Sequence, residues 1–212
     1  MVVKQRAYGG QSASARTAQR REQLLRAGLA LIGEGGVQAV SVRGVLERAK
    51  LAPRYFYENF TNLDELIVAI FDQVLQEVVA AGTAPATDTR RDMRSRVRDA
   101  LSATTELLVG EPAKGRILVI DSLTTPALVP LREQGLRMIG AIIVVTAQAT
   151  DPMREVDLET AEITAMFLVG GFAELVAALL KDNGRYHRDA VIDRCTDLFL
   201  AARETALTAA RK

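Results

Sequence analysis

Hydrophobic and polar positions along the chain follow the spacing of α-helices. From residue 17 to residue 32 apolar side chains recur three and four positions apart, and Gly35-Gly36 then ends the segment, as glycines do at helix C-termini. Ser41 and Asn62 are good N-cap residues, and Pro53 suits the first turn of a helix, where its missing N–H is not needed. The pattern predicts helices over residues 17–32, 42–50, 53–60, 61–80, 89–109, 113–122, 127–149, 156–182 and 188–209.

Alternating β-branched residues, which would indicate strands, are rare, so the predicted fold class is all-α with about nine helices. Residues 1–16 are polar and basic and are interpreted as a mobile arm. We predict a first domain over residues 17–62 and a second over residues 63–212, with a linker at Gly82–Asp88.

The 212 residues include a single cysteine, Cys195, and a single histidine, His187. A disulfide framework or a Cys/His zinc site needs several such residues, so no metal or other cofactor is expected. The first twenty residues hold no apolar leader segment, and we expect a soluble cytoplasmic protein. The run Ile163–Leu180 carries one charge, but its small residues favour a helix buried in part by a second subunit over a membrane span.

The net charge of +1 conceals an uneven distribution along the chain. Residues 1–60 carry ten basic and four acidic side chains, a net charge of +6, whereas residues 61–212 have a net charge of −5. Only the part of a protein that faces phosphates needs to be basic, so this division points to a nucleic-acid partner for the N-terminal segment.

Residues 41–60 have the pattern of a helix-turn-helix, in which the second helix enters the major groove of DNA. Arg54 can pair bidentately with guanine, whereas hydroxyl and amide groups typically hold phosphates. Phe56 and Phe60, four positions apart, are predicted to face inward. The alternative is a small three-helix core with exposed tyrosines. The candidate DNA-binding residues are Ser41, Arg43, Pro53, Arg54, Tyr55, Tyr57, Asn59 and Thr61.

The stretch from about Arg20 to Phe71 resembles the N-terminal domain of the TetR/AcrR family of bacterial transcriptional regulators. The residues that carry the resemblance are Gly35-Gly36, Ser41-Val42, Val45, Ala49, Leu51, Phe56-Tyr57, Phe60 and Leu66. The chain departs from the family pattern where Lys50 and Arg54 replace glycines, Asn59 replaces a histidine, and Leu63 replaces a lysine that contacts phosphate.

This resemblance implies a second helical domain that binds a small effector and forms a homodimer through its last two helices. The expected interface residues are Gly170, Gly171, Val191, Cys195, Leu198 and Ala202. Cys195 lies on an apolar stripe and is interpreted as a small buried hydrophobic residue, not a redox sensor.

The expected effector is small and largely apolar, because the helices that would surround a cavity offer mainly apolar side chains. Asp121 is the candidate polar group among the residues expected to line the cavity, which are Phe71, Leu75, Leu107, Ile117, Asp121, Leu136, Met166 and Phe167. A stripe of Arg90, Arg94 and Arg98 has two interpretations, an anion site or a solvated salt-bridged face, and interleaved acids favour the second.

Together these features predict a sequence-specific DNA-binding regulator, a repressor that a small-molecule effector releases from a near-palindromic double-stranded operator. Groups suited to catalysis are scarce, so an enzyme is not expected. The rival interpretation is a small all-α ligand-binding protein or enzyme that does not bind DNA.

Overall fold

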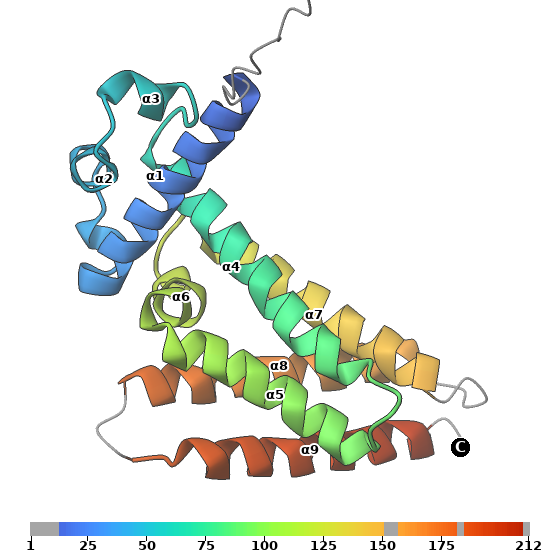
Figure 1. The fold of residues 1–212 in the computed structure, drawn as a ribbon. Helices are drawn as coiled ribbons and strands as arrows, with labels where there is room; N and C mark the ends of the chain where they lie inside the picture. The colour runs from blue at the N-terminus through green and yellow to red at the C-terminus, as the bar shows by residue number, and fades with distance from the viewer. Residues whose placement is uncertain (1–12, 151–156, 182–184, 210–212) are drawn as a thin grey trace, which may run out of the picture.

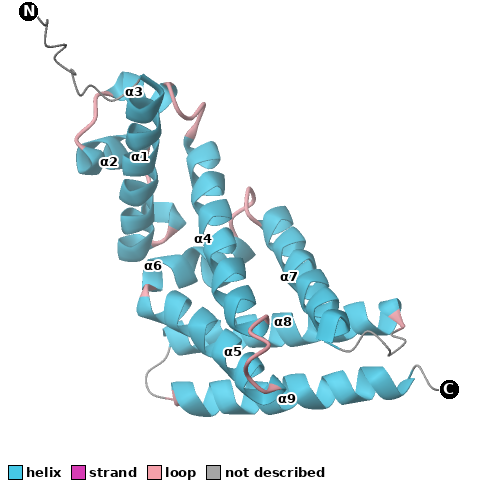
Figure 2. Cartoon of the chain, turned by 45° about the vertical axis from the view of Figure 1, so that its right-hand side comes forward, coloured by secondary structure: helices cyan, strands magenta, loops and turns pink. Residues whose placement is uncertain are grey.

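The computed structural model describes residues 13–150, 157–181 and 185–209, and these residues form nine α-helices and no strand (Figures 1 and 2). The predicted fold class is confirmed for this part of the chain. Most of the predicted arm at residues 1–16 lies outside the described residues, and the first helix already includes its last four positions.

The first three helices form a unit at one end of the molecule (Figure 1). They are α1 (Ala13–Gly35), α2 (Val42–Ala49) and α3 (Pro53–Tyr57), with a 3₁₀ turn, η1 (Val37–Ala39), between α1 and α2. α4 (Leu63–Ala86) leads from this unit into the remainder of the molecule.

The remaining elements build a helical body. They are α5 (Met93–Gly110), α6 (Pro112–Gly115), a π-helical turn η2 (Arg116–Ile120), a 3₁₀ turn η3 (Asp121–Leu123), α7 (Val129–Thr150), α8 (Leu158–Lys181) and α9 (Arg188–Ala209). In Figure 1, α8 and α9 lie at the end opposite the three-helix unit, and α5 packs against both.

Two predicted boundaries are wrong. α4 continues through most of the expected linker Gly82–Asp88, and Pro85 falls in its last turn. Thr87 closes that turn, because its N–H and its hydroxyl both donate to the Thr83 carbonyl, at 3.1 and 2.9 Å. The helix predicted over 113–122 is instead divided among α6, η2 and η3.

One hydrophobic core joins the three-helix unit to the body. Leu24, Phe56 and Phe60 occupy its N-terminal end, and the buried face of α4 continues it toward Leu118 and Val176. The apolar side chains of α4 thus serve as core residues. This role accounts for a sequence that is also long and apolar enough to cross a membrane.

A second, smaller cluster corrects part of the predicted dimer interface. Val191 and Cys195 are buried within the same chain, where they pack with Leu101 and Ile192 between α5, α8 and α9. They face inward because α9 lies against α5 over much of its length. Burial also raises the pKa of the Cys195 thiol, which suits the predicted role as a small hydrophobic residue.

α8 differs from α4 in leaving much of its apolar surface uncovered. It too is long and apolar enough for a membrane span by composition, but Phe167 is 79% exposed and Ile163 is 64% exposed. Gly170 and Gly171 continue this face with open space above them. Leu198 of α9 is also exposed, whereas Ala202 turns toward the interior.

Candidate nucleic-acid interface and internal cavity

Local capping interactions define where α2 begins, where it ends and where α3 begins. The Ser41 Oγ accepts the Gly44 N–H at 3.1 Å and so caps the first turn of α2. α2 ends at Lys50, whose φ of 55° is the only positive value at a non-glycine residue in the described part of the chain. Pro53 then starts α3 at its first turn, as predicted.

α3 has one buried side and one exposed side. Phe56 and Phe60 are buried, with ring centroids 5.8 Å apart, and fix the helix to its scaffold as predicted. Arg54 and Tyr57 lie on the other side, and Tyr57 is 64% exposed. A short helix anchored by aromatic residues thus presents polar side chains outward.

Tyr55 is fixed between two guanidinium groups. Arg20 of α1 lies 4.5 Å from the centre of its ring, and Arg54 lies 4.6 Å from it. The Arg54 Nη2 also donates to the Tyr55 hydroxyl at 2.6 Å. These cation–π contacts orient Arg54 on the exposed face before any ligand arrives.

Two of the candidate DNA-binding residues, Asn59 and Thr61, also make hydrogen bonds within the fold. The Asn59 side-chain amide donates to the Tyr55 carbonyl at 2.7 Å, so it helps to close the end of α3 and does not project outward. The Thr61 N–H donates to Glu65 Oε2 at 2.6 Å while Asn62 caps the N–H of Glu65, which forms the N-terminal cap of α4. Hydrogen bonds from Thr61 also lower the pKa of Glu65.

The basic charge of this unit exceeds its acidic charge both on α1 and at the helix-turn-helix. Each acid of residues 13–60 is paired with a nearby arginine, in the pairs Arg26–Glu22, Arg48–Glu34, Arg43–Glu47 and Arg20–Glu58. Within the described residues, Lys50 and Arg54 have no carboxylate within 4.0 Å. The surplus positive charge therefore lies on Lys50 in the turn and Arg54 of α3, together with Arg16 and Arg21 of α1, while Arg43 shares its charge with Glu47.

The helical body contains a cavity of about 300 Å³. Its walls come from α4, α5, α7, α8, η2 and the end of α9, and most of its lining is aliphatic or aromatic. Phe71, Leu75 and Leu136 line it as the sequence predicted. The volume is at the lower end of the range for small-molecule sites.

The other predicted cavity residues lie elsewhere. Ile117 is fully buried in the main core and Leu107 packs at its edge, whereas Met166 is only partly buried and Phe167 faces outward. α5 and α8 each direct a different stripe inward, represented by Leu108 and Val169. Periodicity locates the apolar face of a helix but not the part of that face beside a void.

Asp121 links the body to the three-helix unit and does not reach into the cavity. Its Oδ2 accepts the backbone N–H of Val37 in η1 at 2.9 Å and lies 3.4 Å from Arg116 Nε. Gly36 adopts a φ of 78°, and an added Cβ there would lie 2.5 Å from the Arg116 guanidinium. The glycine after α1 therefore both ends that helix and admits Arg116.

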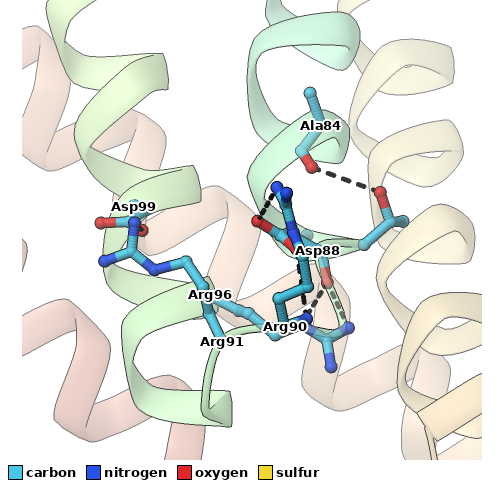
Figure 3. A network of polar contacts seen from close by, with 8 residues as sticks. Ala84, Asp88, Arg90, Arg91, Arg96 and Asp99 are labelled. Carbon is cyan, nitrogen blue, oxygen red and sulfur yellow. Dashed lines mark hydrogen bonds and ion pairs between the residues drawn. The ribbon is translucent and has the colours of Figure 1, made fainter.

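The arginine stripe on α5 is a salt-bridged face, as the interleaved acids indicated. Arg94 binds Asp197 at 2.7 Å and Arg98 binds Asp193 at 2.8 Å, both on α9, and Arg90 binds Asp88. The arginine that lines the cavity is Arg96, which sequence reasoning missed. Figure 3 shows Arg96 at the junction of α4 and α5, beside the Arg90–Asp88 and Arg91–Asp99 pairs.

A capped helix-turn-helix with unpaired cations on its outer side defines the chain as a helix-turn-helix DNA-binding protein. The family model for bacterial regulatory proteins of the tetR family matches residues 24–70, which span most of α1, α2, α3 and the first part of α4. The chain is a TetR-family transcriptional regulator. That family consists of regulators and not enzymes, so the rival interpretation is set aside.

Solved structures share the fold over most of the chain. A tetR-family transcriptional regulator from Streptomyces coelicolor has a TM-score of 0.71 at 13% identity, over 91% of this chain and 83% of that one. A TetR-like regulator from Rhodococcus sp. RHA1 has a TM-score of 0.65 at 19% identity, over 90% and 97%. FadR from Bacillus subtilis, solved in complex with stearoyl-CoA, has a TM-score of 0.69 at 14% identity, over 85% and 98%. No curated protein matches the chain.

Proposed function

We propose that this regulator is a cytoplasmic repressor that leaves a near-palindromic operator when a small, largely apolar effector fills the cavity. The observation that supports this most directly is the position of the cavity. Phe71 of α4 and Leu118 of η2 both line it, and α4 and η2 both contact α1 of the helix-turn-helix unit. A ligand that alters the packing of these two elements also alters how the three-helix unit is held.

The proposed signal reaches the three-helix unit by two routes. α4 extends directly from that unit, and Asp121 binds the Val37 N–H directly after η2 ends. An effector changes operator affinity only to the extent that it binds the two conformations differently, commonly by about 1–3 kcal/mol. Within the family fold, FadR from Bacillus subtilis supports an effector with an apolar chain, because its structure holds stearoyl-CoA, whose acyl chain is a long hydrocarbon.

The proposed homodimer uses the uncovered face of α8 together with exposed parts of α9. Ile163, Phe167, Gly170, Gly171 and Leu198 form this face, and the glycines allow close approach of a second helix. A two-fold dimer would place two α3 helices about 34–36 Å apart, which matches successive major grooves of a near-palindrome. The inward-facing Val191 and Cys195 support the interface from behind.

Phe167→Glu tests the dimer, because a buried carboxylate disfavours the interface. The variant should sediment as a monomer at concentrations where the parent chain is dimeric, and its operator affinity should fall at least tenfold. Val145→Glu is the matched control, since Val145 is also 64% exposed but lies on α7. An unchanged dimer in Phe167→Glu would place the interface elsewhere.

A gel-shift assay on the DNA upstream of the regulator's own coding region tests operator binding. The assay should be run at several stated salt concentrations, since phosphate contacts make the affinity salt-dependent. We expect a sequence-specific shift that small apolar molecules reverse. Loss of a reporter's repression when they are added would support a repressor, whereas higher expression in the protein's presence would indicate an activator.

A further inference from the structure

The charge of the cavity lining is one-sided. Three arginines line it, Arg96, Arg132 and Arg203, and no aspartate or glutamate is present among the lining residues that the structure describes. An apolar cavity with cations and no acids is complementary to an apolar molecule that carries negative charge. We propose, on the basis that the cavity is the effector site, that the effector is a medium-chain carboxylate whose carboxyl group pairs with Arg96.

Arg96 carries this inference because its charge is buried and is not neutralised by an acid. The residue is only 7% exposed. Its Nε donates to the Ala86 carbonyl at 2.7 Å, and its Nη2 donates to the same oxygen. No carboxylate in the described part of the chain lies within 4.0 Å of it, because Asp88 and Asp99 bind Arg90 and Arg91 (Figure 3).

A buried cation is costly unless an anion or several hydrogen bonds offset the loss of water. The Ala86 carbonyl lies at the negative end of the α4 dipole and provides part of that compensation. A carboxylate would provide the rest through charge-assisted hydrogen bonds to the guanidinium. Arg132 is different, because it lies 3.7 Å from Glu174.

The distribution of polar and apolar lining residues also indicates how the ligand is oriented in the cavity. Thr83, Arg96, Gln148 and Arg203 come from the C-terminal end of α4, the N-terminal end of α5 and the C-terminal ends of α7 and α9. Figure 1 shows these four helix ends on the same side of the body, away from the three-helix unit. The opposite part of the lining, which includes Phe71, Leu118 and Val176, is apolar apart from Arg132, which is already paired with Glu174.

A carboxylate at Arg96 therefore places its hydrocarbon chain toward α4 and η2, the elements that contact α1. A volume of about 300 Å³ corresponds to on the order of ten non-hydrogen atoms, given about 30 Å³ for one water molecule in the liquid. Acids of about eight to twelve carbons fill that space. A thioester of coenzyme A lacks the free carboxylate, so it cannot form the same pair with Arg96.

Isothermal titration of the full-length protein with decanoate, decanol and decanoyl-CoA tests the proposal. We expect decanoate to bind at least tenfold more tightly than decanol or decanoyl-CoA, and stearate to bind more weakly than decanoate. In Arg96→Gln the preference for decanoate over decanol should disappear. Arg90→Gln is the matched control, because Arg90 is exposed, binds Asp88 and does not line the cavity.

The ratio of decanoate to decanol affinity separates ligand pairing from a structural role of Arg96 at the end of α4. A structural role alone would weaken both ligands together and leave their ratio unchanged. If Arg96→Gln does not fold, the test uses the unaltered protein and Arg96→Lys. In both, decanoate should bind more than tenfold more tightly than decanol. Equal binding of decanol, preference for decanoyl-CoA, or no binding of any probe would overturn the proposal.

A gel shift with the same probes separates this inference from the proposed function. Selective, Arg96-dependent binding of decanoate without release of the operator would leave the ligand class standing and refute the effector-released repressor. Release of the operator by decanol but not by decanoate would support the effector-released repressor and refute the carboxylate.

Discussion

Replacement of Asp121 by alanine should weaken the connection between the helical body and the helix-turn-helix unit. The Asp121 side chain is only 14% exposed, and its Oδ2 accepts the Val37 N–H at 2.9 Å. Hydrogen bonds to charged groups contribute about 1.5–3 kcal/mol, and alanine leaves the part-buried Val37 N–H without an acceptor. We take about 2 kcal/mol as the free energy lost, which corresponds to a factor of roughly thirty in an equilibrium constant.

Hydrogen exchange at the Val37 amide measures this quantity without any ligand. In Asp121→Ala, the opening equilibrium at Val37 should rise by roughly thirtyfold, while amides in α3 change little. The fold-change that an effector makes in operator affinity should become smaller, because one of the two proposed routes is lost while α4 remains. These two effects share one cause, because the hydrogen bond lost is the direct link from η3 to η1.

Asp121→Asn is the matched control. An asparagine oxygen can still accept the Val37 N–H, although the ion pair with Arg116 is lost, so most of the protection and most of the effector response should remain. The reasoning is refuted if Val37 exchanges at the same rate in Asp121→Ala as in the parent chain. It is also refuted if the effector response survives intact while global stability falls, because the contact would then be structural alone.

Three further predictions concern single side chains. Lys50→Gly should raise the free energy of unfolding by about 1 kcal/mol, because glycine adopts the left-handed conformation without strain, and should reduce the salt dependence of operator affinity by about one charge in a salt titration. Arg54→Ala should lower discrimination at one base pair by about 1–3 kcal/mol, whereas Ser41→Ala should weaken all sequences alike, as measured by gel shift on operator variants. The Arg90 guanidinium holds the pKa of Asp88 at about 2, below its unfolded value, so this contribution to stability is present above about pH 4 and is lost as pH falls toward 2. Asp88→Asn should make the midpoint of unfolding less dependent on pH in that range, as measured by thermal unfolding at several pH values.

The helix-turn-helix was predictable because its signals are local. Capping by Ser41, the start of α3 at Pro53 and the inward faces of Phe56 and Phe60 each depend on a few neighbouring residues. Local sequence did not predict which polar groups the fold itself uses. The Asn59 side chain donates to the Tyr55 carbonyl of the preceding helix, α3.

Lys50 shows how a departure from the family pattern becomes intelligible only with the backbone in view. Its left-handed conformation explains why glycine is the usual residue there. Lysine keeps that conformation at some cost in strain and adds a cation at the turn, with no carboxylate within 4.0 Å in the described residues. Compared with glycine, lysine at position 50 therefore lowers stability and adds positive charge on the side of the unit that carries Arg54.

Long-range pairing decided the remaining assignments. The spacing of Arg90, Arg94 and Arg98 predicts a shared helix face, but only the packing of α5 on α9 shows that two of them bind acids more than ninety positions away. Arg96 differs from these neighbours by its position on the helix, which turns it into the cavity and away from every carboxylate in the described residues. A charge that is unremarkable in the sequence becomes informative once burial and partners are known, because only then can its neutralisation by the protein be assessed.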